Sequence, residues 1–394
     1  FQTLGDMDQK EAAFVGNPPQ IGIFLADSGL YQRTFPDDVP HSSGGVAGMN
    51  DALLSLKYRE LAGEDVAADS AAFLARIAAD PGLYNDYVTS GPFPHFFGMA
   101  MPLIKGGVVL RPVQLENVDR FPDYLKDYDT MILSYEFLKP RKPEYHGVLA
   151  DWVKKGGRLI YVGDGSDPYH QAKDWWNTGS ETWADPAHHL FACLGAKAEP
   201  GVQSIGEGIL AWYPVSPGRI TLTAEAAEAW QSFVRETAFP GYTWQSRFDM
   251  QRGPYRIACC MEEGMDAQPL TITGTFADLL ENGFPILREK TLLPGDNTLL
   301  FDLNMVKEEP VRIIGTSARI FSLEDCGEGY TLTCKAAADI TVHMRLKLKR
   351  QVTKAEAVDE KGNRIPVDWA WDGETSTVLL TFDSTNAMTT VNLT

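Results

Sequence analysis

The chain has 394 residues, of which 44% are hydrophobic and 22% are charged, and its formal net charge is −18. This length exceeds what one hydrophobic core usually serves, so we expect two or three domains, and the composition excludes wholesale disorder. The acidic balance argues against nucleic-acid binding and against docking on an anionic membrane, because both need basic surfaces.

No apolar run reaches about 18 residues, so no membrane-spanning helix is expected. The five cysteines form no CxxC pair and no disulfide framework, which favours a cytoplasmic location of the bacterial type. The chain begins with Phe1 and not with an initiator Met, so we expect a fragment of a longer protein, and secretion stays open. No dinucleotide, P-loop, zincin or esterase motif occurs, so we expect no cofactor and no metal.

In the first part of the chain, apolar strand patterns alternate with helical patterns. The strands are predicted at 20–27, 108–113, 130–134, 158–162 and 208–213, and the helices at 46–62, 67–79, 92–105, 143–155, 186–194 and 224–236. Such alternation is typical of an α/β domain with a parallel sheet. We assign this domain to residues 1–245, with 241–253 as the linker that follows.

From residue 254 onward, short β-type runs follow one another, separated by turn signals. They are predicted at 255–260, 269–275, 298–302, 311–321, 330–334, 340–346, 378–382 and 390–393. Strands at this spacing indicate β-sandwich modules. We place one module at 254–315 and a second, C-terminal one at 316–394. The expected fold class is therefore α/β plus all-β, with a flavodoxin-like or amidotransferase-like parallel sheet first.

The segment 128–166 is the most informative stretch. A buried strand at 130–134 leads to a helix at 143–155, and Gly156-Gly157 end that helix before the strand at 158–162. This is one right-handed βαβ unit. The second strand runs into the tight turn Gly163-Asp164-Gly165.

The sequences FPHFFGMAMPLIKGGVVLRPVQLENV and LADWVKKGGRLIYVGDG resemble the α/β domain that follows the catalytic barrel in family 42-type β-galactosidases. In those enzymes the domain is similar to class I glutamine amidotransferases but lacks their activity. The resemblance implies that the turn after the second strand is the elbow that carries the amidotransferase Cys. Here the elbow holds Gly163, Asp164 and Gly165, so the nucleophile is missing. RGPYRIACCMEEG and the region from about 317 onward resemble β-sandwiches that accompany such domains.

The resemblance implies a non-catalytic accessory and oligomerisation portion of a glycoside hydrolase-like protein. It also implies that an N-terminal catalytic barrel is absent from this sequence, that the chain forms a homo-oligomer, and that carbohydrate is its ligand. We expect no activity in this fragment and assign no catalytic residue to it. The alternatives are a stand-alone carbohydrate-active hydrolase with its site on the rim of the α/β sheet and a carbohydrate-binding protein that uses the sandwiches.

Three acidic residues each follow a predicted strand of the sheet: Asp27, Glu136 and Asp164. The carboxyl ends of parallel strands share one edge, where open α/β sheets bind ligands. Two of these carboxylates could form a glycosidase pair, and Asp164 could bind a sugar hydroxyl or act as a nucleophile. Turn formation and helix capping explain the same residues without any ligand.

An aromatic stretch, 168–183, follows the fourth predicted strand of the sheet. Tyr169, Trp175, Trp176 and Trp183 could stack on a sugar beside the carboxylates, and with Asp164 they make up the candidate ligand site. The alternative is that they seal a core or a subunit interface. Adjacent His188 and His189 on a helix cannot both face one metal. Asp185, which precedes that helix, is interpreted as its N-cap.

Overall fold

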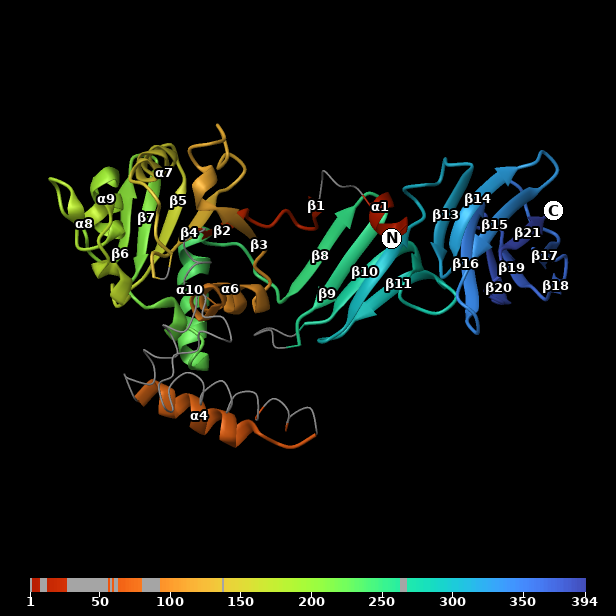
Figure 1. Cartoon of the computed structure of the whole chain (residues 1–394), viewed down its shortest axis with the longest axis horizontal. Coiled ribbons are helices and arrows are strands. Elements are labelled where there is room, and N and C mark those ends of the chain that lie inside the picture. The colour runs from red at the N-terminus through yellow and green to blue at the C-terminus, as the bar shows by residue number, and fades with distance from the viewer. Residues whose placement is uncertain are drawn as a thin grey trace. The chain divides into compact units, whose positions relative to one another are not determined.

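The computed structural model describes residues 2–7, 13–26, 56, 59, 63–79, 93–136, 138–262 and 268–394. The chain divides into two compact units, Pro18–Gln245 and a second one that joins Phe1–Asn17 to Ser246–Thr394. Figure 1 shows the elements of both units, coloured from red at the N-terminus to blue at the C-terminus. Together they make an α/β part and a β-rich part, as the sequence predicts at this level.

The α/β unit contains a six-stranded sheet with the spatial order β3-β2-β4-β5-β7-β6. Its strands are β2 (Ile21–Leu25), β3 (Leu110–Gln114), β4 (Thr130–Leu133), β5 (Arg158–Val162), β6 (Gly201–Ile205) and β7 (Gly208–Tyr213). All neighbours are parallel except β6, which pairs antiparallel with β7 at the edge. The central strands are buried on both faces, which explains their continuous apolar runs.

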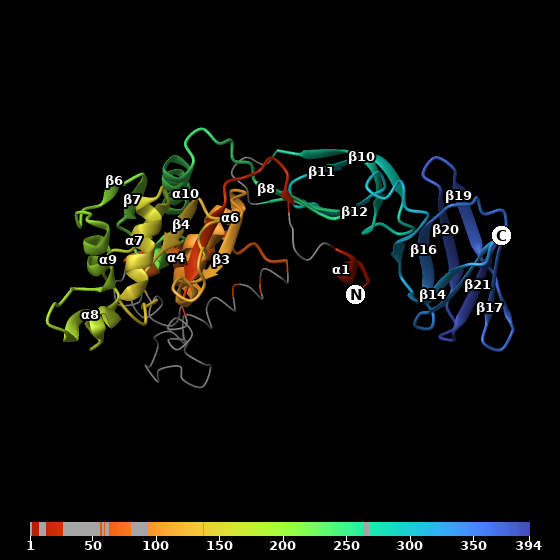
Figure 2. The ribbon, with the colours of Figure 1, turned by 90° about the horizontal axis from the view of Figure 1, so that it is seen from above.

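Helices cover both faces of this sheet (Figure 2). They are α6 (Phe93–Lys105), α7 (Glu144–Lys154), α9 (Pro186–Leu194) and α10 (Ala224–Ala238), and the unit also contains α4 (Ala67–Ala79) and α8 (Trp175–Thr178). Residues of α6 and α10 share one core cluster with the strands, including Leu103 and Trp230, and residues of α7 and α9 share the other, including Leu149 and Leu190. Asp27 and, apart from Leu56 and Arg59, the predicted helix at 46–62 lie outside the residues that the structure describes.

The predicted helix ends are confirmed where the chain carries capping residues. The side chain of Asp185 accepts a hydrogen bond from the His188 N–H, Pro186 opens α9, and Gly195 closes it in the left-handed conformation with φ 72°. These local signals mark both ends of α9.

The β-rich unit begins with α1 (Gln2–Asp6) and contains three sheets. The six-stranded sheet has the order β1 (Ala13–Phe14), β8 (Arg247–Arg252), β9 (Tyr255–Cys260), β12 (Asn297–Asp302), β10 (Leu270–Asp278), β11 (Ile286–Leu292). The four-stranded sheet has the order β13 (Val311–Thr316), β16 (Thr341–Leu348), β20 (Thr377–Asp383), β19 (Asp368–Asp372). The five-stranded sheet has the order β14 (Arg319–Asp325), β15 (Tyr330–Lys335), β21 (Thr389–Leu393), β17 (Ala355–Asp359), β18 (Arg364–Ile365).

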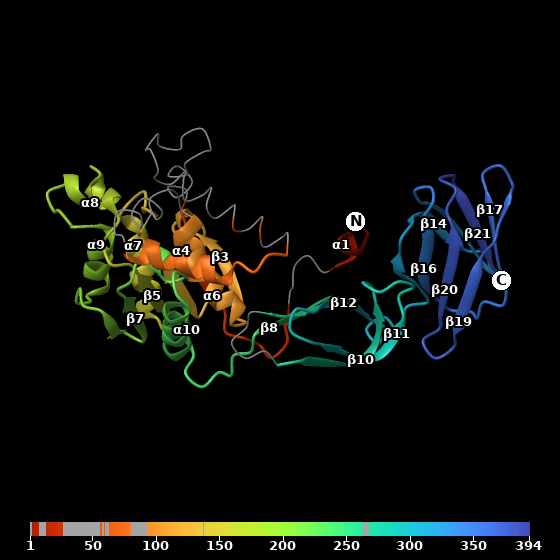
Figure 3. The same ribbon diagram turned by 90° about the horizontal axis from the view of Figure 1, so that it is seen from below.

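The four- and five-stranded sheets are the two layers of a C-terminal sandwich (Figure 3), and one core cluster joins Leu346 and Val378 of the first to Leu332 and Val391 of the second. The strands predicted at 255–260, 269–275 and 298–302 are β9, β10 and β12 of the single six-stranded sheet. Its register shifts in β10 between Thr273 and Phe276.

Three expectations about boundaries need correction. The segment 241–253 is not a linker throughout, because Arg247–Arg252 is strand β8, paired with β9. Residues 1–17 belong with the β-rich unit, because Ala13–Phe14 pairs with β8. The run predicted at 311–321 is two strands, β13 and β14, which lie in different sheets.

Candidate functional site

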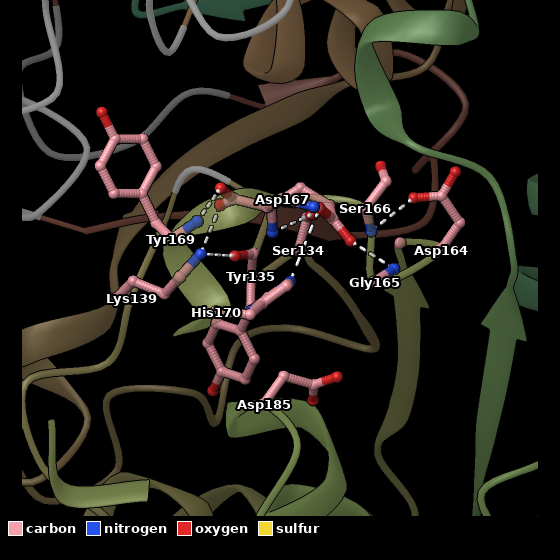
Figure 4. Close-up of polar contacts among 12 residues, drawn as sticks. Ser134, Tyr135, Lys139, Asp164, Gly165, Ser166, Asp167, Tyr169, His170 and Asp185 are labelled. Atoms are coloured by element: carbon pink, nitrogen blue, oxygen red, sulfur yellow. Dashed lines mark hydrogen bonds and ion pairs between the residues drawn. The ribbon is translucent and has the colours of Figure 1, made fainter. Parts of the chain in front are cut away.

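The carboxyl ends of β4 and β5 carry the described candidate acids, Glu136 and Asp164, and Figure 4 shows the polar contacts around them. Their surroundings differ. Glu136 is only 1% exposed, whereas Asp164 lies on the surface. Asp27 lies outside the described residues, so the structure leaves its part of the rim untested.

Glu136 ties the loop after β4 to the turn after β5. Its Oε1 accepts a hydrogen bond from the Gly165 N–H at 2.8 Å, and its Oε2 accepts one from the Asp167 N–H at 2.9 Å. Gly163 lies so close that a Cβ there would come within 2.8 Å of Oε1. A carboxylate that accepts two backbone N–H bonds is held in one orientation and satisfies both donors.

Asp164 shapes the turn from the outside. Its Oδ1 accepts a hydrogen bond from the Ser166 N–H at 3.1 Å, and Gly165 has φ +76°. An Asp side chain that bonds the backbone two residues on is an Asx turn, and the left-handed φ explains the glycine. This is the ligand-free role that the sequence left open for Asp164.

Asp167 and Lys139 form a buried ion pair that the sequence did not predict. The Lys139 Nζ donates to Asp167 Oδ2 and to the Tyr135 carbonyl, both at 2.5 Å, and the Tyr169 N–H donates to Asp167 Oδ1 at 2.9 Å. Burial lowers the pKa of Lys139, and Asp167 opposes that shift. The sequence gives little warning of this pair, because the two residues are 28 positions apart in different loops.

His170 completes the cluster. It is 3% exposed, its Nε2 lies 3.6 Å from Glu136 Oε2, and neither ring nitrogen has a hydrogen-bond partner among the described residues. One ligand atom each from Glu136, Asp167 and His170 lies within 4.8 Å of the others. We call Glu136, Lys139, Asp167 and His170 the rim cluster.

The four aromatic candidates have different surroundings. The Trp176 indole is 1% exposed and its Nε1 donates to the His170 carbonyl at 3.0 Å. Trp175 is half-buried and donates to the Pro140 carbonyl at 2.8 Å, while half-buried Trp183 meets His189 edge-on. Trp176 therefore offers no ring face to a sugar. Its role is packing, which corrects its place in the expected ligand wall.

Tyr169 is 43% exposed, but it does not share a site with Asp164. Figure 4 shows the two side chains on opposite sides of the rim cluster. The structure therefore does not bring the candidate carboxylate and the exposed ring together.

A second, largely buried network joins the loop after β4 to α7 and α9. Tyr135 Oη is 2.7 Å from His146 Nε2, and His146 Nδ1 is 2.7 Å from His189 Nδ1. Burial lowers the pKa of His146 from its ordinary value of 6.5 to about 3, so this imidazole is neutral. We call Tyr135, His146 and His189 the histidine chain; sequence reasoning missed it, because its members come from three separate elements.

The remaining predictions about His and Cys can be placed as well. His188 Nδ1 lies 2.9 Å from Asp185 Oδ1, whereas His189 contacts His146, so the adjacent histidines face different partners as expected. Cys193, on α9, lies 3.8 Å from His189 Nδ1, and burial raises the pKa of its thiol. A thiol whose pKa is raised has less of the thiolate needed for nucleophilic attack.

Chemically, the rim cluster is a set of paired charges. Both Glu136 oxygens hold backbone N–H groups, and Asp167 is paired with Lys139. A glycosidase needs one carboxylic acid that can donate a proton and a second carboxylate that is free to attack or to activate water. The described part of the rim does not show such a pair. Among all the residues that the structure describes, no helix has the length and apolar character needed to cross a membrane.

No protein-family model matches the chain. No curated protein matches it either. Parts of the chain are similar to solved glycoside hydrolase structures. A cold-adapted β-galactosidase from Rahnella sp. R3 has a TM-score of 0.27 and 13% identity, over 56% of this chain and 37% of that one. An exo-carrageenase of family GH42 from Bacteroides ovatus has a TM-score of 0.21 and 8% identity, over 77% and 27%.

Endo-glycoceramidase II from Rhodococcus sp. has a TM-score of 0.19 and 11% identity, over 98% of both chains. The chain thus spans well under half of the length of the first two of these proteins. Since all three TM-scores are below 0.5, any function has to be argued from this chain's own residues.

Proposed function

We propose that the α/β unit is a non-catalytic accessory domain of a carbohydrate-processing, glycoside hydrolase-like protein. The observation that carries the proposal is the use of Glu136. The buried Glu136 carboxylate accepts hydrogen bonds from the Gly165 and Asp167 N–H groups. It therefore stabilises the turn where an amidotransferase would carry its nucleophile.

The strand order supports an amidotransferase-like or flavodoxin-like ancestry for the unit. Among the parallel strands, numbered by their order in the chain, β3-β2-β4-β5-β7 reads 2-1-3-4-5, which is the order of flavodoxin-like sheets. The turn after β5 follows the strand that would present the nucleophile, and it contains Gly163, Asp164 and Gly165.

A domain without chemistry of its own acts through what it binds. The partners that fit this role are further copies of this chain, in a homo-oligomer, and a catalytic barrel. The net charge of −18 disfavours nucleic acid and an anionic membrane as alternatives.

Two measurements on the full chain test the proposal. With glutamine and with a panel of aryl glycosides, we expect no turnover above a buffer blank, and sedimentation velocity at micromolar concentration should show a defined oligomer. Glycoside hydrolysis that is lost in Glu136→Gln would instead favour a stand-alone hydrolase. A strict monomer would remove the oligomerisation role.

A further inference from the structure

We propose that the rim cluster is a binding site for a divalent transition metal of the zinc type, with Glu136, Asp167 and His170 as its protein ligands. The proposal goes beyond the accessory role and does not depend on it. A bound ion would reinforce the turn after β5.

The unsatisfied imidazole of His170 is the first observation. The side chain is 3% exposed, and neither ring nitrogen has a hydrogen-bond partner within the described residues. Buried polar groups are nearly always paired, so an unpaired one indicates a group that the protein chain does not itself supply.

The geometry is the second observation. His170 Nε2 and Glu136 Oε2 are 3.6 Å apart, which is too long for a hydrogen bond. Two atoms bound tetrahedrally to one zinc ion, each at about 2.0 to 2.1 Å, lie roughly 3.3 Å from each other. The three ligand atoms lie within 4.8 Å of one another, so movements of roughly 1 Å would bring all of them to bonding distance.

The carboxylates are also oriented as metal ligands usually are. Glu136 accepts N–H bonds from Gly165 and Asp167, and Asp167 accepts one from Tyr169. Such outer contacts fix the direction of the ligand oxygens, and each oxygen has a further lone pair. One neutral imidazole with two carboxylates is a donor set that suits zinc and neighbouring transition metals better than calcium, which prefers all-oxygen sites.

The charge of the cluster points the same way. Glu136 and Asp167 contribute two negative charges, and Lys139 contributes one positive charge through its pair with Asp167. These three described side chains together carry a net charge of −1, which a cation bound beside Glu136 would offset.

The test is a calorimetric titration of the chelator-treated full chain with zinc chloride. We expect one strong site per chain, and His170→Ala should weaken it by about 100-fold or more, because a direct ligand is lost. His188→Ala is the matched control, because His188 is half-exposed and lies beside a carboxylate of its own, Asp185, where adventitious zinc would bind. The zinc affinity of His188→Ala should stay within about 2-fold of that of the parent chain.

Two further readouts keep the proposal open to refutation if His170→Ala folds poorly. The melting temperature of the parent chain should rise by about 5 to 10 °C at a free zinc concentration of about 100 times Kd. X-ray absorption of the zinc-loaded parent should show a nitrogen and oxygen shell with one imidazole. No binding below millimolar zinc, equal binding in His170→Ala, or sulfur in the shell would each overturn the proposal.

Discussion

The α/β unit contains two buried polar networks that solve the same physical problem in different ways. The rim cluster is charged and connects to backbone N–H groups, with Glu136 holding Gly165 and Asp167. The histidine chain is neutral and connects side chain to side chain, from Tyr135 through His146 to His189. The comparison teaches that buried charge in this unit occurs where backbone donors or a counter-ion are present, and that elsewhere burial keeps the groups neutral.

The largest effect should come from removing the anchor of the rim cluster. Glu136→Ala leaves the Gly165 and Asp167 N–H groups without their acceptor and should lower the free energy of unfolding by about 3 to 5 kcal/mol. Urea denaturation followed by circular dichroism measures this loss. Asp164→Ala, which removes one exposed turn contact, should cost no more than about 1 kcal/mol. Equal costs for the two variants would break the contrast between anchor and surface turn.

The histidine chain should make the fold sensitive to acid. His146 has a pKa of about 3 in the folded state against its ordinary 6.5, so below pH 6.5 the unfolded chain binds a proton that the folded chain does not. The stability that neutral His146 provides is therefore present above pH 6.5 and is lost as the pH falls toward 3. By pH 4 the loss should reach about 3 kcal/mol.

The matched comparison for this prediction uses His146→Gln and His343→Gln. His343 lies on β16, in the other unit, and its side chain is only partly buried. The first variant should flatten the pH dependence of stability between 6.5 and 4, and the second should leave it unchanged. An unaltered slope in His146→Gln would show that the histidine chain does not carry the acid sensitivity.

A smaller effect should follow from crowding the rim cluster. A methyl group at position 163 would come within 2.8 Å of Glu136 Oε1, so Gly163→Ala should cost about 1 to 3 kcal/mol. Gly147 lies in helix α7, and a Cβ there meets nothing within 4 Å. Gly147→Ala should therefore stabilise the chain by about 0.5 to 1 kcal/mol. Thermal melts of both variants test this contrast. A melting temperature that changes in the same direction in both variants would contradict it.

The sequence predicted the elements that local signals define. Helix α9 is confirmed from Pro186 to Leu194, and strand β5 from Arg158 to Val162, because capping residues, glycines and a continuous apolar run mark their ends. Strand β8 was missed, since Arg247–Arg252 has little apolar pattern and is defined by pairing with its neighbours. In β20, Val378 and Leu380 are buried and Leu379 between them is half-buried, because successive residues of a strand point to opposite faces.

The sequence places two acidic residues at the rim, whereas a ligand site there stays a prediction. The rim position of Glu136 and Asp164 follows from the strand order, and Glu136 is indeed at the centre of a polar cluster. Lys139 and His170 could not be assigned to it, because their roles depend on how two loops fold over the ends of β4 and β5. Trp176 shows the converse case, where a residue chosen for its sugar-stacking chemistry is used in packing.

The central claim is that Glu136 is a structural anchor, and amide hydrogen exchange at Gly165 and Asp167 tests it most directly. Gly165 lies on the surface, so its N–H would exchange quickly unless a buried acceptor held it. We predict that both amides are strongly protected in the parent chain and lose most of that protection in Glu136→Gln, while remaining protected in Asp164→Ala. Exchange of both amides at the rate of an unstructured peptide in the parent chain would contradict the account.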